Sequence, residues 1–204
     1  MLRVNEIFSS IQGEGANSGR VATFIRLSGC NIRCPFCDTN HSSYREMTVE
    51  EILDEVTEDF VVITGGEPFA QPKVNEVYEL IKLLQNDYHQ IAIETNGTIR
   101  IDDSERHGID WEDVWVTVSP KAGFFNGKVK QRQTWANEVK VIFDGKHEPS
   151  CYIDSIVTDY YYLQPCDTGD AKRNQEIIKQ MLEYQKKNTS WRISLQLQKI
   201  LNVR

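Results

Sequence analysis

FVVITGGEPFAQPKVNEVYELIKLLQNDYHQIAIET, residues 60–95, contains the unit from which we expect the fold to be built. Phe60–Thr64 is a short apolar run followed by two glycines, and it predicts a buried strand. Residues 74–84 predict an amphipathic helix with apolar side chains on one side, at Val77, Leu80, Ile81 and Leu84. Ile91–Thr95 predicts the next strand, and the order strand, helix, strand is typical of a parallel sheet.

The same pattern continues on both sides of this unit. Val21–Leu27 predicts a strand upstream. Thr48 and Glu51 form a capping box that opens a helix, whose apolar face consists of Val49, Ile52, Leu53 and Val56. Further strands are expected at residues 114–118, 138–143, 160–164 and 193–197, and a long helix at about residues 171–187.

The chain is short for a closed barrel of strands and helices. A complete eight-fold β/α barrel needs about 250 residues, and this chain has 204. Several connections, such as the one from Thr95 to Val114, carry little helical pattern. We therefore expect one α/β domain over residues 1–204, an incomplete TIM-like β/α barrel with reduced helix content.

Composition narrows the class of protein. A hydrophobic content of 40% suits one globular domain with a sizeable core. The formal net charge of −7 argues against a nucleic-acid partner, and the short basic runs at residues 128–132 and 186–187 are typical of solvated surface. No apolar stretch reaches the length of a membrane span, and MLRVNEIFSS does not resemble a signal peptide. We expect a cytoplasmic protein that binds neither membrane nor nucleic acid.

Cys30, Cys34 and Cys37 occur in SGCNIRCPFCDT with the spacing C-x3-C-x2-C. Three thiolates on one short loop can bind three irons of a [4Fe–4S] cluster and leave the fourth iron open to a reactant. A structural zinc site is the alternative, because His41 would complete a Cys3His set, although zinc ligands usually come from two separated segments. A disulfide is disfavoured in an acidic chain with five cysteines and no signal peptide.

Polar motifs follow four of the expected strands. They are TGGEP at residues 64–68, ETNG at 94–97, SPK at 119–121 and QPCD at 164–167. Chemistry in β/α architectures takes place at the carboxyl ends of the strands, so we expect these motifs to meet in one site. The glycines of GGEP allow close approach of the backbone to a ligand, or they form an ordinary turn before a proline-started helix.

Together, C-x3-C-x2-C and GGEP resemble the radical S-adenosylmethionine superfamily. With IQGEG at residues 11–15, Arg26 and the other motifs above, the chain resembles the 7-carboxy-7-deazaguanine synthases from its first strand to its C-terminus. The resemblance implies a carbon–nitrogen lyase of queuosine biosynthesis that converts 6-carboxy-5,6,7,8-tetrahydropterin to 7-carboxy-7-deazaguanine. Hydrogen abstraction at C6 starts a ring contraction that releases ammonia. The implied cofactors are a [4Fe–4S] cluster, S-adenosylmethionine and Mg²⁺.

The resemblance also implies roles for particular residues. The cluster ligands are Cys30, Cys34 and Cys37, and Thr39 is the Mg²⁺ ligand. The residues expected to bind S-adenosylmethionine are Phe36, Cys37, Asp38, Gly66, Glu94, Ser119, Pro120, Lys121, Gln164, Pro165, Cys166 and Asp167. Those expected to bind the pterin are Ile11, Gln12, Gly13, Arg26, Thr64 and Arg204, with Arg26 on the carboxylate. Gln12 as a turn residue, Thr39 as a loop hydroxyl and Glu94 as a turn cap remain alternatives.

The C-terminal sequence LQLQKILNVR departs from the family pattern, because Gln198 stands where a histidine is common and Arg204 where a proline is common. The implied partners are a flavodoxin-type electron donor and a second copy of the chain. A glycyl-radical activating enzyme would share the cysteine spacing but would act on a protein backbone, with no need for IQGEG or Arg26. A metal-stabilised binding module without enzymatic activity is the third possibility.

Overall fold

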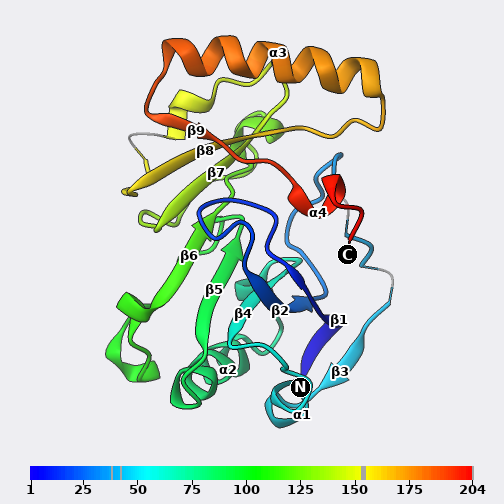
Figure 1. Cartoon of the computed structure of the whole chain (residues 1–204). Coiled ribbons are helices and arrows are strands. Elements are labelled where there is room, and N and C mark those ends of the chain that lie inside the picture. The colour runs from blue at the N-terminus through cyan, green and yellow to red at the C-terminus, as the bar shows by residue number, and fades with distance from the viewer. Residues whose placement is uncertain (38, 42, 153–154, 204) are drawn as a thin grey trace.

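A computed structural model describes residues 1–37, 39–41, 43–152 and 155–203. One nine-stranded sheet runs through this part of the chain, in the order β3-β1-β2-β4-β5-β6-β7-β8-β9 (Figure 1). The strands are β1 Leu2–Ile11, β2 Val21–Leu27, β3 Arg45–Met47, β4 Phe60–Gly65, β5 Gln90–Thr95, β6 Val114–Val118, β7 Glu138–Phe143, β8 Tyr160–Pro165 and β9 Trp191–Ile193. The sheet is open, with β3 and β9 as its edges, as expected for an incomplete barrel.

Helices are few, which confirms the expected reduction. The α-helices are α1 Val49–Leu53, α2 Val74–Asn86, α3 Ala171–Lys187 and α4 Leu197–Ile200. The connections from β5 to β6, β6 to β7 and β7 to β8 contain only short 3-10 turns among their described residues. Figure 1 shows α1 and α2 at one end of the molecule and α3 at the other. None of the described helices combines the length and the apolar character that a membrane span requires.

In the spatial order of the sheet, every neighbouring pair from β2 to β9 is parallel. The other edge of the sheet, formed by β1 and β3, is antiparallel. β1 pairs antiparallel with both β2 and β3, and neither β1 nor β3 was among the predicted strands. An antiparallel neighbour needs only a short reversal of the chain, such as residues 12–20, whereas a parallel neighbour needs a long crossover. The expected parallel sheet is therefore present, and an antiparallel edge that was not predicted adjoins it.

The unit quoted from residues 60–95 forms as expected. Leu80, Ile81 and Leu84 on α2 are fully buried, and they belong to the same core cluster as Ile63 on β4. Full burial of each such side chain contributes about 1.5–3 kcal/mol. The capping box of α1 is also present, because Thr48 Oγ1 accepts from Glu51 N at 3.2 Å and the Glu51 carboxylate accepts from Thr48 N at 2.8 Å.

The last predicted strand, residues 193–197, is wrong in its boundaries. β9 ends at Ile193, and Leu197 already begins α4. The chain leaves the sheet because its next side chains are held by the β1–β2 loop: Ser194 Oγ accepts from Gly15 N at 3.0 Å, and Gln196 Nε2 donates to Glu14 Oε1 at 2.9 Å. The C-terminal segment thereby covers the carboxyl ends of the strands.

Candidate active site

A cavity of about 550 Å³ opens at the carboxyl ends of the parallel strands. Most of the residues singled out from the sequence contribute to its walls: Ile11, Gln12, Gly13, Arg26, Cys30, Cys34, Phe36, Cys37, Thr39, Thr64, Gly66, Glu94, Ser119, Lys121, Gln164, Pro165, Cys166 and Asp167. Pro120 is buried and does not line the cavity. Asp38 and Arg204 lie outside the described residues, so their expected roles stay predictions.

The three cysteines share one side of this cavity. Cys30 and Cys34 are half-buried and Cys37 is exposed. Burial raises the pKa of the Cys30 and Cys34 thiols, and the neighbouring thiols raise both further because like charges repel. Asn96 Nδ2 donates to Cys30 Sγ at 3.7 Å, which fixes one end of the loop. Three sulfur donors that face one hollow fit an iron–sulfur cluster with an open coordination position.

The zinc alternative fits less well. The His41 ring accepts from Gly29 N at 3.4 Å through Nδ1. A tetrahedral zinc site would require its sulfur ligands at about 2.3 Å from one point. No three His, Cys, Asp or Glu side chains converge in that way within the described ranges. A cluster binds its thiolates to separate irons and does not require them to meet at one metal ion.

The GGEP loop packs against the cysteine loop, backbone to backbone. Gly65 has φ of 113°, a conformation that favours glycine. A Cβ atom on Gly66 would lie 1.8 Å from the carbonyl oxygen of Gly29, the residue before Cys30. Glu67 N donates to that same oxygen at 2.9 Å. Gly66 is therefore required for the approach of the two loops.

Glu67 binds the GGEP loop to the end of β5. Its carboxylate is fully buried and accepts from Thr95 Oγ1 and from Asn96 N, both at 2.7 Å. Burial raises its pKa, and these hydrogen bonds oppose the rise. Because Asn96 donates to Cys30, Glu67 connects the GGEP loop through the end of β5 to the cysteine loop.

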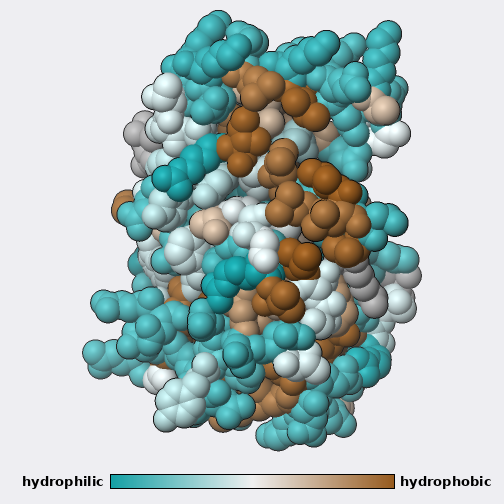
Figure 2. All heavy atoms as spheres, in the orientation of Figure 1, coloured by the Kyte–Doolittle hydropathy of each residue, from teal (hydrophilic) through white to brown (hydrophobic). Residues whose placement is uncertain are grey.

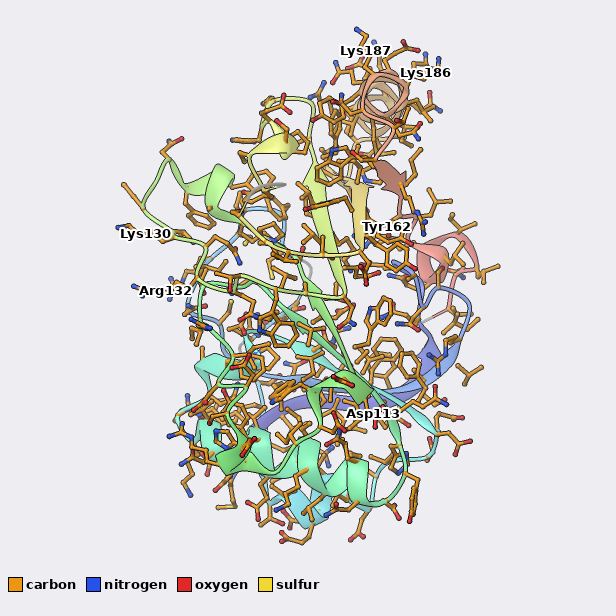
Figure 3. All side chains as sticks on the ribbon, turned by 90° about the vertical axis from the view of Figure 1, so that its left-hand side faces the viewer. Asp113, Lys130, Arg132, Tyr162, Lys186 and Lys187 are labelled. Atoms are coloured by element: carbon orange, nitrogen blue, oxygen red, sulfur yellow. The ribbon has the colours of Figure 1, made fainter. Side chains whose placement is uncertain are left out.

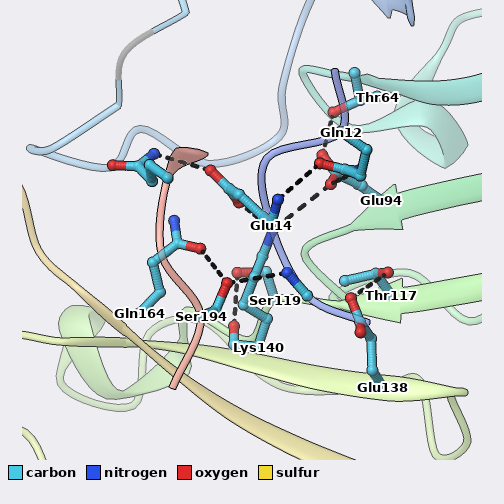
Figure 4. Close-up of polar contacts among 12 residues, drawn as sticks. Gln12, Glu14, Thr64, Glu94, Thr117, Ser119, Glu138, Lys140, Gln164 and Ser194 are labelled. Carbon is cyan, nitrogen blue, oxygen red and sulfur yellow. Dashed lines mark hydrogen bonds and ion pairs between the residues drawn. The ribbon is translucent and has the colours of Figure 1, made fainter. Parts of the chain in front are cut away.

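A network of polar side chains also lines the cavity, and Figure 4 shows its contacts. Glu94 accepts from Gln12 Nε2 at 3.2 Å and from Thr64 Oγ1 at 2.7 Å. Lys140 Nζ lies 3.5 Å from Glu94 and forms an ion pair with Glu14. Glu94 thus connects β4, β5, β7 and the β1–β2 loop, which is more than the capping of a following turn.

Lys140 determines the electrostatics of this network. Burial lowers the pKa of a lysine, yet the carboxylates of Glu14 and Glu94 raise the pKa of Lys140 above its ordinary value. Burial would raise the pKa of Glu14, but Lys140, Gln196 and Gln198 together lower it to about 2. The network therefore holds Lys140 and Glu14 as a charged pair at neutral pH.

Hydrogen bonds also hold two basic side chains, Arg26 and Lys121, in the cavity wall. Arg26 donates to Glu6 Oε1 at 2.9 Å through Nε and to Thr39 Oγ1 at 3.2 Å through Nη1. Lys121 Nζ donates to Ser119 Oγ at 2.6 Å, and burial lowers the pKa of Lys121 to about 8. Arg26 and Lys121 thus both contribute basic groups to the cavity wall.

Sequence reasoning missed Lys140 and Gln196 in this site. It gave no role to Glu14 or Asn96, although both lie in the motifs IQGEG and ETNG. Lys140 did give a signal, because it stands between Val139 and Val141 in a strand that otherwise reads as buried. A lysine in such a strand needs a buried partner. Glu14 gave no such signal, since polar residues are ordinary in glycine-rich turns.

Known proteins match the chain along its whole length. The family model described as the Radical SAM superfamily matches residues 24–195. The 7-carboxy-7-deazaguanine synthase of Bacteroides thetaiotaomicron is 37% identical, with 100% of both chains covered. That of Haemophilus influenzae is 33% identical over 97% of this chain and 92% of its own. The crystal structure of QueE from Escherichia coli superposes with a TM-score of 0.67 at 26% identity, over 96% of this chain and 93% of that one. The chain belongs to the 7-carboxy-7-deazaguanine synthases of the radical S-adenosylmethionine superfamily.

Proposed function

We propose that this chain converts 6-carboxy-5,6,7,8-tetrahydropterin to 7-carboxy-7-deazaguanine with release of ammonia. One observation carries the proposal: the three cysteines and a hydrogen-bonded network of polar side chains line the same cavity. When bound, the cluster and S-adenosylmethionine supply the 5′-deoxyadenosyl radical that removes hydrogen from C6 of the pterin. The protein's own residues bind and orient the two molecules.

Cys30, Cys34 and Cys37 would hold the cluster, and the loops beside them would hold S-adenosylmethionine. The backbone of Gly66 is open to a ligand because it has no side chain. The other residues expected to bind S-adenosylmethionine also line the cavity: Phe36, Ser119, Lys121 and residues 164–167. The Phe36 ring packs edge-on against Phe124, with ring centroids 4.6 Å apart, and it can support a flat adenine.

Arg26 is the candidate partner for the pterin carboxylate. Its bonds to Glu6 and Thr39 hold the guanidinium in place, and a planar guanidinium matches a carboxylate with two parallel hydrogen bonds. Gln12, Glu94 and Thr64 offer acceptors and donors for the edge of the pterin ring. Gln198 adds a buried Oε1 atom that has no hydrogen-bond partner in the described structure, which suits an N–H of the substrate.

Mg²⁺ belongs to the proposal through Thr39. The hydroxyl of Thr39 already accepts from Arg26, and a guanidinium at this position opposes a bare cation. A substrate carboxylate between the two would remove that repulsion. Because Mg²⁺ is usually held by few protein oxygens together with water and substrate, the metal should bind only with the pterin present.

Partners and compartment are inferred from family resemblance and composition. A low-potential donor of the flavodoxin type would reduce the cluster. A homodimer is supported by exposed apolar side chains near the C-terminus, where Figure 2 shows them gathered over α4: Leu195, Ile200, Leu201 and Val203. All five cysteines are free thiols, in keeping with the cytoplasm.

Anaerobic reconstitution tests the proposal directly. Wild-type enzyme with iron, sulfide, reductant and S-adenosylmethionine should form the deazaguanine product from the carboxytetrahydropterin, identified by mass. Cys34→Ala should retain the fold by circular dichroism but lose the cluster's visible absorbance and cofactor cleavage. Cys151→Ala is the control, because that cysteine lies outside the cavity. Cofactor cleavage without turnover of the pterin would favour a glycyl-radical activating enzyme, and a colourless zinc protein would favour a binding module.

A further inference from the structure

An exposed basic segment lies beside the cysteine loop. Residues 126–132 read NGKVKQR and contain three positive charges and no negative one, in a chain whose net charge is −7. Lys128, Lys130 and Arg132 are exposed, while Val129 and Gln131 between them are half-buried. This alternation turns all three charges toward solvent, and Figure 3 shows Lys130 and Arg132 projecting from one side of the molecule.

Contacts at both ends hold the segment next to the cysteines. Before it, the ring of Phe124 packs against Phe36 of the cysteine loop. After it, Arg132 N and Gln133 N donate to the carbonyl oxygen of Gly97 at 2.8 and 2.9 Å. The segment is therefore tied to the rest of the site at both ends.

Gly97 belongs to the turn that holds the cysteine loop from the other side. Its neighbour Asn96 donates to Cys30 Sγ at 3.7 Å and to Asn31 Oδ1 at 3.1 Å. Thr98 Oγ1 accepts from Asn31 Nδ2 at 2.7 Å. In space, Gly97 and Asn96 therefore link the end of the basic segment to Cys30, the first of the three cysteines.

Arg33, exposed on the cysteine loop itself, adds a fourth positive charge. We define the basic rim as Arg33, Lys128, Lys130 and Arg132. Arg26, Lys140 and Lys199 each pair with a carboxylate. Within the described ranges none of the four rim residues does. Lys186 on α3, by contrast, pairs with Glu183 at 2.7 Å and lies far from the rim in Figure 3.

We propose that the basic rim is the docking surface for an acidic one-electron donor protein, which would deliver its electron through the exposed edge of the cysteine loop. The inference rests on the proposed function, since it needs a cluster bound to Cys30, Cys34 and Cys37. The donor loses one electron and the enzyme gains it, and no proton or chemical group is transferred. Transient redox complexes bury little surface, so charge complementarity supplies much of their orientation and association rate.

Nucleic acid is the other anionic partner to consider. A rim of four charges in a chain of net charge −7 is small for a nucleic-acid footprint, which needs a larger basic area. The rim also borders the cysteine loop, where an electron must enter. These two facts favour a redox protein.

The test compares two double variants with the same change in charge. Lys128→Glu/Lys130→Glu alters the rim, and Lys186→Glu/Lys187→Glu alters the far helix. Binding of a purified acidic flavodoxin to the cluster-loaded enzyme should weaken about tenfold or more for the rim variant at low salt and change little for the control. The wild-type affinity should fall as salt rises, and that of the rim variant should depend less on salt.

Turnover adds a second readout. With reduced flavodoxin as donor, the rim variant should require about tenfold more donor for half-maximal rate, whereas turnover with dithionite should equal that of wild type. Equal flavodoxin binding by the two double variants would overturn the docking surface, and so would a parallel loss with dithionite. Stronger loss of tRNA binding than of flavodoxin binding would assign the rim to nucleic acid and also overturn it. The two proposals can fail separately. If no variant formed product with dithionite, the proposed function would fail. The docking surface would still stand if flavodoxin binding remained dependent on the rim charges.

Discussion

Lys140→Met should destabilise the fold strongly, because it leaves two carboxylates without their counter-charge. The Lys140 side chain is 6% exposed and that of its partner Glu14 is 14% exposed. The pKa of Glu14 falls from 4.5 to about 2, and Lys140 is the largest cause of that lowering. At about 1.36 kcal/mol per pKa unit, this shift corresponds to about 3 kcal/mol. Breaking a buried ion pair typically costs about 3–5 kcal/mol, which agrees.

The assay is urea unfolding of the cluster-free protein at pH 7, followed by tryptophan fluorescence. Lys140→Met should lower the free energy of unfolding by about 3 kcal/mol. The double variant Glu14→Gln/Lys140→Met should recover part of that loss, since one buried charge is removed with its partner. Lys172→Met, on the exposed surface of α3, is the control and should change stability by less than about 0.5 kcal/mol.

The stabilisation by the Glu14–Lys140 ion pair should depend on pH. Because the pKa of Glu14 is lower in the folded state, the stabilisation is fully present above pH 4.5 and is lost as pH falls toward 2. The difference between wild type and Lys140→Met should therefore shrink below pH 4.5. A loss smaller than about 1 kcal/mol at pH 7, or a double variant as unstable as the single one, would refute the reasoning.

Three further predictions concern the ligands. Gly66→Ala should reduce cluster retention, measured as iron per chain, because its Cβ would lie 1.8 Å from the Gly29 carbonyl oxygen; full iron content would contradict the close approach of the loops. Arg26→Ala should weaken pterin binding by about 2–5 kcal/mol in calorimetric titration but barely affect S-adenosylmethionine. Glu6→Gln, which keeps the guanidinium, is the control, and equal weakening of both ligands would indicate a structural arginine. Thr39→Ala should reduce the stimulation of turnover by Mg²⁺ while the visible spectrum stays unchanged, and identical Mg²⁺ titrations would return Thr39 to an ordinary loop hydroxyl.

Local pattern was sufficient for most elements of the fold. β2, β6 and β7 occupy the ranges predicted from apolar runs, and α3 begins and ends where its pattern does. This success has a simple reason: strand and helix periodicity, capping residues and glycine turns act within a few residues of one another. The same locality explains the cysteine loop, whose three thiols lie within eight residues.

Features that depend on distant partners could not be predicted in this way. β1 was missed because only its first residues alternate between buried and half-buried positions, and its pairing with β2 and β3 supplies the rest. The end of β9 was misplaced because Ser194 and Gln196 bind the β1–β2 loop, about 180 positions earlier.

The sequence by itself determined the family and most of the strand–helix order. Only the tertiary structure decided how the charges are arranged around them. Glu14 and Lys140 are 126 positions apart, yet they form a buried ion pair. The basic segment at residues 126–132 reads as ordinary surface until its ends are seen against Phe36 and Gly97. Electrostatic and packing interactions depend on distance in space, which a linear pattern does not contain.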